Sequence, residues 1–160
     1  MARIYISLGS NINKRTNLLN GLHALQAHFG ELNHSSVYES EAVGFNGSNF
    51  YNSVAGADTD LSLEQVCKIL KQIERDNGRT PQDKKFSPRT LDLDLLFYDD
   101  VICQTPAQIP RDEITKNAFV LWPLYEIAPD FFHPVANATI EQLWQDYDKS
   151  KQNLWKVTIE

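Results

Sequence analysis

Cysteine is scarce in this chain, and long apolar runs are missing from it. The two cysteines, Cys67 and Cys103, stand far apart and in no Cys-x-x-Cys pair, so neither a disulfide framework nor a zinc site is indicated. No segment approaches the roughly 20 apolar residues that a membrane span needs. The chain also passes from Met-Ala-Arg directly into a strand-like pattern without an apolar leader. We therefore expect a cytoplasmic protein without a membrane partner.

Positive charge is also in short supply. Lysine and arginine number 15 against 21 aspartates and glutamates, which gives a formal net charge of −6. Such a chain repels a long phosphate backbone unless its basic residues gather on one face. This balance predicts no nucleic-acid partner, although a local basic cluster can still bind a small anion.

The remaining composition is that of an ordinary globular domain. Apolar residues make up 42% and charged residues 22% of the chain, close to the average for globular proteins, and no low-complexity tract argues for disorder. A length of 160 residues falls within the usual size of one domain. We expect a single domain over residues 1–160 that acts as a monomer.

Hydrophobic periodicity predicts the order of the strands and helices. The predicted strands cover residues 3–8, 33–40, 50–58, 90–97 and 154–159, and the predicted helices cover about 15–29, 63–77, 119–128 and a last segment from 139. Gly30 is expected to end the first helix in a left-handed cap. Ser62 and Gln65 predict a capping box at the second helix, and Pro123 is expected to break or start the third.

The order of these elements predicts the fold class. The pattern β-α-β-β-α-β, followed by further helical material, fits an α+β sandwich. In such a sandwich the helices lie on one face of a mainly antiparallel sheet. No internal repeat or linker argues for a second domain.

The segment from Thr90 to Phe97 carries the predicted chemistry. Its leucines alternate with Asp92 and Asp94, so both carboxylates share one strand face, with Cα atoms about 6.6 Å apart. This pair suits Mg²⁺, which takes one or two protein carboxylates and completes its shell with water and phosphate oxygens. The competing interpretation is an edge strand whose acidic residues only face water.

Basic residues converge on the same place. Arg89 lies three residues before Asp92. The polar segment that leads in adds Arg79, Lys84 and Lys85. Carboxylates that hold Mg²⁺, with guanidinium groups on phosphate oxygens, are the usual means of stabilising charge in phosphoryl transfer. The sequence contains no Gly-x-x-x-x-Gly-Lys-[Ser/Thr], which excludes a P-loop kinase.

At this point the sequence resembles a known family. The run from Ser87 to Leu96, Ser-Pro-Arg-Thr-Leu-Asp-Leu-Asp-Leu-Leu, resembles the signature of the 6-hydroxymethyl-7,8-dihydropterin pyrophosphokinases. Further matches, which cover nearly the whole chain, are Gly9-Ser10-Asn11, Gly44 with Asn52, Glu74 with Gly78-Arg79, and the run from Phe119 to Pro129.

The resemblance implies a ferredoxin-like fold, ATP and 6-hydroxymethyl-7,8-dihydropterin as substrates, two Mg²⁺ ions bound with ATP, AMP as a product, and mobile loops that close over the site. It implies that Asp92 and Asp94 hold both metal ions. The residues implied to contact ATP and its triphosphate are Arg79, Arg89, Glu74, Lys85 and Arg111. The residues implied to bind the pterin are Ser40, Val43, Phe50, Asn52, Phe86, Asp92 and Phe119.

The chain departs from the family pattern at four positions. Arg111 stands where the family usually has histidine, and Asn117 where it usually has arginine. Pro81 replaces a basic residue, and Phe86 replaces the tryptophan of the mobile loop. Each lost charged hydrogen bond costs about 1.5–3 kcal/mol. These departures leave open a catalytically weakened paralogue that acts as a pterin- or nucleotide-binding protein.

A second alternative keeps only the fold. Ferredoxin-like sheets also serve as RNA-binding modules. The acidic balance of the chain and the paired aspartates both count against that function.

Overall fold

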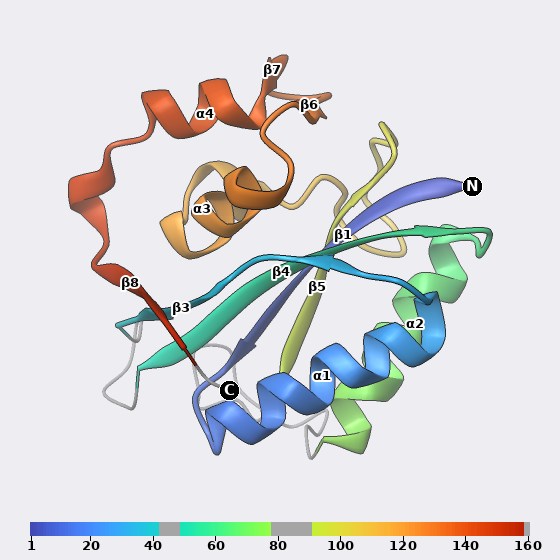
Figure 1. The fold of residues 1–160 in the computed structure, drawn as a ribbon. Coiled ribbons are helices and arrows are strands. Elements are labelled where there is room, and N and C mark those ends of the chain that lie inside the picture. The colour runs from blue at the N-terminus through green and yellow to red at the C-terminus, as the bar shows by residue number, and fades with distance from the viewer. Residues whose placement is uncertain (42–48, 78–90, 159–160) are drawn as a thin grey trace.

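An antiparallel sheet forms the centre of the fold (Figure 1). In the computed structural model, which describes residues 1–41, 49–77 and 91–158, the strands follow the order β5-β1-β4-β3-β8, and β2 also pairs with β4. Their bounds are β1 Ala2–Ser10, β2 Asn33–His34, β3 Val37–Ser40, β4 Phe50–Thr59, β5 Asp92–Tyr98 and β8 Leu154–Val157. Each of these pairings is antiparallel, so the predicted sheet type is confirmed.

Helices cover both faces of this sheet (Figure 1). Their bounds are α1 Lys14–Phe29, α2 Leu63–Asp76, α3 Ala118–Ile127 and α4 Ile140–Asp146. Helices α1 and α2 pack on one face, whereas α3 packs on the other and carries α4 against it. The prediction of helices on one face only is therefore wrong for α3 and α4. Tyr5, Val54 and Phe97 make that second face apolar as well, and an apolar face must be covered.

Short elements complete the described part of the chain. They are the 3₁₀ turns η1 Asp112–Thr115 and η2 Lys149–Lys151, and a hairpin of β6 Phe132–His133 with β7 Ala138–Thr139. Among residues 1–41, 49–77 and 91–158, no helix combines the length and apolar character needed to cross a bilayer.

The predicted strand over residues 33–40 is interrupted. It forms β2 and β3, which both pair with β4. Between them, the backbone N–H of Ser35 donates to Val54 O at 2.8 Å, while the Ser35 hydroxyl accepts from Val54 N at 3.0 Å. The serine hydroxyl thus stands in for a backbone carbonyl, which splits the strand without leaving the Val54 amide unpaired.

The helix ends follow the sequence signals closely. The hydroxyl of Ser62 accepts from Gln65 N at 3.2 Å, and the Gln65 side chain accepts from Ser62 N at 2.9 Å, which confirms the capping box. Gly30 has the predicted positive φ of 78°, but its ψ of −143° lies outside the left-handed helical region. Its amide still donates to Gln26 O at 2.9 Å and ends α1.

Pro123 neither breaks nor starts α3, contrary to prediction. The helix runs through it. Proline removes one hydrogen bond, which its N–H would have donated to Phe119 O. Val120, Leu121 and Leu124 are buried in the second core, and this packing holds the helix across the gap.

A register shift in β5 changes the predicted alternation. Leu91, Leu93 and Leu95 face the first core, under α1 and α2, as expected. The β1–β5 register then shifts between Tyr5 and Ile6. Because a bulge adds a residue to one strand, Leu96 and Phe97 both join the second core. The predicted alternation therefore holds through Leu96 and is wrong at Phe97.

Candidate active site

The acid pair lies on the face of β5 turned away from α1 and α2. Asp92 pairs with Gly9 of β1 and Asp94 pairs with Ser7. Both aspartates are partly exposed, whereas Leu93 between them is buried on the opposite face. The prediction that the two carboxylates share one face is thus confirmed by the alternation in this part of the strand.

A row of residues crosses four strands from the acid pair. Gly9 of β1 pairs with Asp92 on one side and with Asn52 of β4 on the other, and Asn52 pairs in turn with Tyr38 of β3. Side chains opposite one another project to the same face. Asp92 and Asn52 are two strand spacings apart, about 10 Å. Because Gly9 has no side chain, the sheet surface between Asp92 and Asn52 carries none at this position.

Asn52 is held in place by Ser40. Its Nδ2 donates to Ser40 Oγ at 2.8 Å, and both residues are buried, with 6% and 4% exposure. Phe50 is half-buried and pairs with Ser40 in the β3–β4 register. Three of the predicted pterin ligands therefore gather at one end of β3 and β4, on the face that carries Asp92.

Space around Asn52 depends on Gly9. A Cβ added to Gly9 would lie 3.4 Å from Asn52 Oδ1. Contacts this short are at the lower edge of ordinary packing, so a larger side chain here would press on the amide and fill the floor between Asn52 and Asp92.

Glu74 lies at the last turn of α2, as predicted, and reaches β5. Its Oε2 accepts a hydrogen bond from Leu93 N at 2.8 Å. The bonded amide belongs to the residue between the two aspartates. This contact fastens α2 to the strand that presents the acid pair. The contact of Glu74 with ATP stays a prediction.

Arg111 is brought directly to the acid pair. The chain turns back after β5 through a bridge between Cys103 and Ile109, and Arg111 N donates to Leu96 O at 3.2 Å. The guanidinium Nη2 then lies 3.7 Å from Asp94 Oδ1 and 2.5 Å from Glu113 Oε1. Sequence reasoning missed Glu113, because nothing marks a glutamate two residues from an arginine as its partner.

The charge of Arg111 is stabilised by its surroundings. Burial disfavours the charged guanidinium, but the carboxylates of Asp94, Glu113 and Asp92 outweigh burial and raise the pKa of Arg111 above its usual range. Its Nε is buried and has no hydrogen-bond partner within the described ranges.

Asn117, where the family usually has arginine, belongs to a structural contact. Its Oδ1 accepts from Gln152 Nε2 at 2.9 Å, and Gln152 Oε1 accepts from Ala118 N at 2.7 Å. Gln152 therefore caps α3 from a distant part of the chain. Phe119, the next predicted pterin residue, is partly buried against the second core at the start of α3.

Several predicted residues lie outside the described ranges. They are Val43, Arg79, Pro81, Lys84, Lys85, Phe86 and Arg89. Their contacts with ATP, metal or pterin stay predictions.

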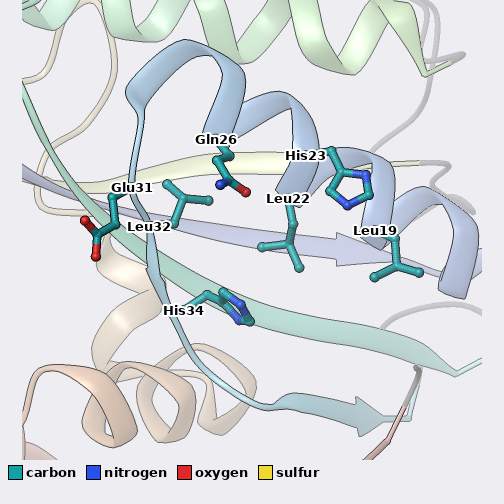
Figure 2. A pocket seen from close by; sticks show the side chains of 7 residues that line it. All are labelled: Leu19, Leu22, His23, Gln26, Glu31, Leu32 and His34. Atoms are coloured by element: carbon teal, nitrogen blue, oxygen red, sulfur yellow. The ribbon is translucent and has the colours of Figure 1, made fainter.

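A separate hollow lies on the other side of the sheet (Figure 2). It has a volume of about 330 Å³ and lies against α1, where His23 and Gln26 face His34 across three leucines. It contains none of the predicted site residues. Across the described part of the chain, no group of three or more His, Cys, Asp or Glu residues is placed to hold a metal ion.

The chain is similar to known proteins over most of its length. Residues 5–129 match the family model described as 7,8-dihydro-6-hydroxymethylpterin-pyrophosphokinase (HPPK). The chain is 34% identical over 145 residues to the 2-amino-4-hydroxy-6-hydroxymethyldihydropteridine pyrophosphokinase of Aquifex aeolicus, covering 89% of this chain and 90% of that protein. It is 33% identical over 156 residues to the protein of the same name from Haemophilus influenzae, covering 92% and 95%.

Solved structures support the fold. The wild-type HPPK-DHPS of Plasmodium falciparum with pteroate superposes with a TM-score of 0.72 at 16% identity, over 90% of this chain and 42% of that one. At this identity the likeness speaks for the fold alone, whereas the family match and the two bacterial relatives cover most of the sequence. The chain therefore belongs to the 7,8-dihydro-6-hydroxymethylpterin-pyrophosphokinase family.

Proposed function

We propose that this chain transfers the pyrophosphoryl group of ATP to the hydroxymethyl group of 6-hydroxymethyl-7,8-dihydropterin in folate biosynthesis, with AMP as the second product. Membership in the family supports the reaction class. One observation carries the assignment of the site: the row Asp92, Gly9, Asn52 on one face of the sheet. In this row Asp92, the predicted metal ligand, and Asn52, the predicted pterin ligand, lie on either side of Gly9, which has no side chain.

In the proposed reaction the pterin hydroxyl oxygen attacks the β-phosphorus of ATP. A new oxygen–phosphorus bond forms, and the bond from the β-phosphorus to the oxygen that bridges it to the α-phosphorus breaks. AMP leaves with that oxygen, and the hydroxyl proton passes to solvent. No covalent intermediate on the protein is needed. Holding both substrates in near-attack geometry contributes about 7–11 kcal/mol.

The residues of the acid pair fit divalent cations by their chemistry. Asp92 and Asp94 offer hard carboxylate oxygens that are partly exposed on one face. Two carboxylates are enough for Mg²⁺, which takes its other ligands from water and phosphate. We propose that two Mg²⁺ ions bind here with ATP; when bound, they supply charge neutralisation on the phosphate oxygens.

Asn52 is the proposed anchor of the pterin. Because its Nδ2 donates to Ser40, its Oδ1 is the amide atom left to accept a hydrogen bond from an N–H group of the pterin ring. Phe50 and Phe119 offer apolar surface for the ring, and Val43 and Phe86 are proposed to complete the slot. Burial of Asn52 and Ser40 keeps water from competing for this contact.

Basic residues are proposed to make most of the contacts with ATP. Arg79, Lys85, Arg89 and Arg111 are proposed to neutralise the triphosphate, and Glu74 to hold the end of α2 beside it. Guanidinium groups suit this role because they bind phosphate oxygens in a bidentate manner.

The test is a product assay with a matched substrate control. The full chain, ATP and Mg²⁺ are incubated with 6-hydroxymethyl-7,8-dihydropterin, and AMP and the pterin pyrophosphate are measured in equal amounts. The same assay with 6-methyl-7,8-dihydropterin, which lacks the hydroxyl, should release no AMP. AMP release that does not depend on the hydroxyl, or no release with either pterin, contradicts the proposal.

Neither alternative function is favoured by an observation. A binding protein without catalysis would bind both ligands in this assay and release no AMP. An RNA-binding module would show affinity for RNA that falls steeply with salt, which the net charge of −6 opposes.

A further inference from the structure

Arg111 is a fixed cation among carboxylates. Its guanidinium bonds to Glu113 Oε1 at 2.5 Å and lies farther, at 3.7 Å, from Asp94 Oδ1. Asp92 is close enough to contribute to its charge state. Arg111 is therefore bound firmly to Glu113 and only by a longer ion pair to Asp94.

The backbone holds this arginine where it is. Arg111 N donates to Leu96 O, and η1 begins at the next residue. The side chains of Arg111, Asp94 and Glu113 are 29%, 27% and 36% exposed, so water screens their charges only in part. A divalent cation at Asp94 must share that carboxylate with Arg111 or displace it.

We propose that Arg111 is a resident counter-ion of the acid pair, retained by Glu113, and that it makes divalent-cation binding depend on a polyphosphate. Without phosphate, the guanidinium repels the entering cation and competes for Asp94. A polyphosphate gives Arg111 a new anionic partner, so that Arg111 competes less with the cation for Asp94. By linkage, each ligand then tightens the other by the same factor.

The inference rests on the proposed function for its choice of ligands. Beyond the proposed function, Arg111 has a role before ATP binds. A cation alone binds poorly, whereas cation and polyphosphate bind together. Arg111 therefore selects for a cation that binds together with a polyphosphate over a cation that binds alone.

The first measurement uses Mn²⁺ alone. Free Mn²⁺ is followed by electron paramagnetic resonance during titration of the full chain without nucleotide. Arg111→Gln keeps a long polar side chain but removes the charge, and it should tighten Mn²⁺ binding about fivefold, the size expected for a partly exposed ion pair. Arg111→Lys keeps the charge and should stay within about twofold of the wild type by the same reasoning.

The second measurement uses a non-hydrolysable ATP analogue with a methylene group between the α- and β-phosphorus. In saturating Mg²⁺, calorimetry should show that Arg111→Gln weakens the analogue about tenfold, because a charged hydrogen bond to phosphate is lost. The same substitution should thus raise the affinity for Mn²⁺ and lower the affinity for the ATP analogue. A loss of folding would weaken both, and a thermal melt checks for it.

Lys116→Gln is the matched control for charge alone. Lys116 lies just after η1 and bonds to Asp112 at 2.7 Å, and its removal changes the net charge by the same amount. It should leave Mn²⁺ binding within about twofold, since an exposed charge outside the site is screened. Equal tightening in Lys116→Gln and Arg111→Gln, or unchanged Mn²⁺ binding in Arg111→Gln, overturns the inference.

Asp94→Asn separates this inference from the proposed function. If Asp94→Asn loses Mn²⁺ binding while Arg111→Gln matches the wild type, only the role of Arg111 is wrong. If Asp94→Asn binds Mn²⁺ as the wild type does, the metal site itself is misplaced, and the proposed function loses its site along with this inference.

Discussion

The same strands make both faces of the sheet, and at the end where Asp92 and Asp94 lie the two faces have opposite characters. Toward α1 and α2, Leu8 and Leu93 pack in a closed apolar core. On the opposite face at this end of the sheet, the neighbouring positions are Gly9, which has no side chain, and the acidic Asp92 and Asp94. Because side chains alternate along a strand, one residue stabilises the fold and the next is available for chemistry. Stability and activity should therefore respond to different substitutions.

The sharpest test of this difference is Asp94→Asn. The amide keeps the shape of the side chain but removes the charge that we propose for metal binding, so the transfer rate should fall at least about a hundredfold. Stability should change by less than about 0.5 kcal/mol, because the residue is partly exposed. AMP release and a chemical denaturation curve measure the two quantities. A normal rate in saturating Mg²⁺ would refute the assignment of the metal ligands.

Leu8→Ala should show the opposite behaviour. Leu8 is 1% exposed and lies in the first core. Leucine-to-alanine changes in such sites cost about 2–5 kcal/mol because a cavity remains. Rate per folded molecule at low temperature should stay near that of the wild type. A large loss of rate in the folded variant would mean that the two faces are coupled.

Asn52→Ala should weaken the binding of the pterin and not the binding of ATP. Removal of the amide should weaken pterin binding about three- to tenfold, the usual range for one neutral hydrogen bond. Binding of the ATP analogue should stay unchanged. Ser40→Ala serves as the graded control, since it frees the Asn52 amide without deleting it and should have a smaller effect. Weaker binding of the ATP analogue by Asn52→Ala would contradict the assignment of Asn52 to the pterin.

The smallest effect is expected at the contact between α3 and β3. Tyr38 donates to Glu126 Oε1 at 2.5 Å, and Ser36 donates to the same carboxylate. Burial opposes the charge of Glu126, but these hydrogen bonds outweigh it and lower its pKa. Burial, with Glu126 nearby, also raises the pKa of Tyr38, so the phenol stays protonated as the donor.

Glu126→Gln should consequently lose less than about 1 kcal/mol of stability at neutral pH, because the carboxylate is partly exposed. The contribution of Glu126 is complete above its unfolded pKa and disappears as the pH falls through the lowered folded pKa. Denaturation curves of wild type and variant should converge in acid. Curves that stay parallel down to acid pH would show that the charge has no part in the contact.

Local signals in the sequence predicted the elements that depend on neighbouring residues. The capping box at Ser62, the strand that carries Asp92 and Asp94, and the placement of Glu74 at the end of α2 all follow from patterns a few residues long. These patterns suffice because hydrogen bonds and side-chain periodicity within one element are set by its own residues.

The tertiary structure alone decided which distant residues meet. Three features have no local signature: the pairing of Arg111 with Glu113 and Asp94, the bulge that turns Phe97 to the second core, and the capping of α3 by Gln152. The continuation of α3 through Pro123 is of the same kind, since burial of that helix outweighs one missing hydrogen bond. Sequence patterns thus determined the elements and the residue types of the candidate site. Packing determined which charges face one another, because that depends on how separate elements bury their apolar faces together.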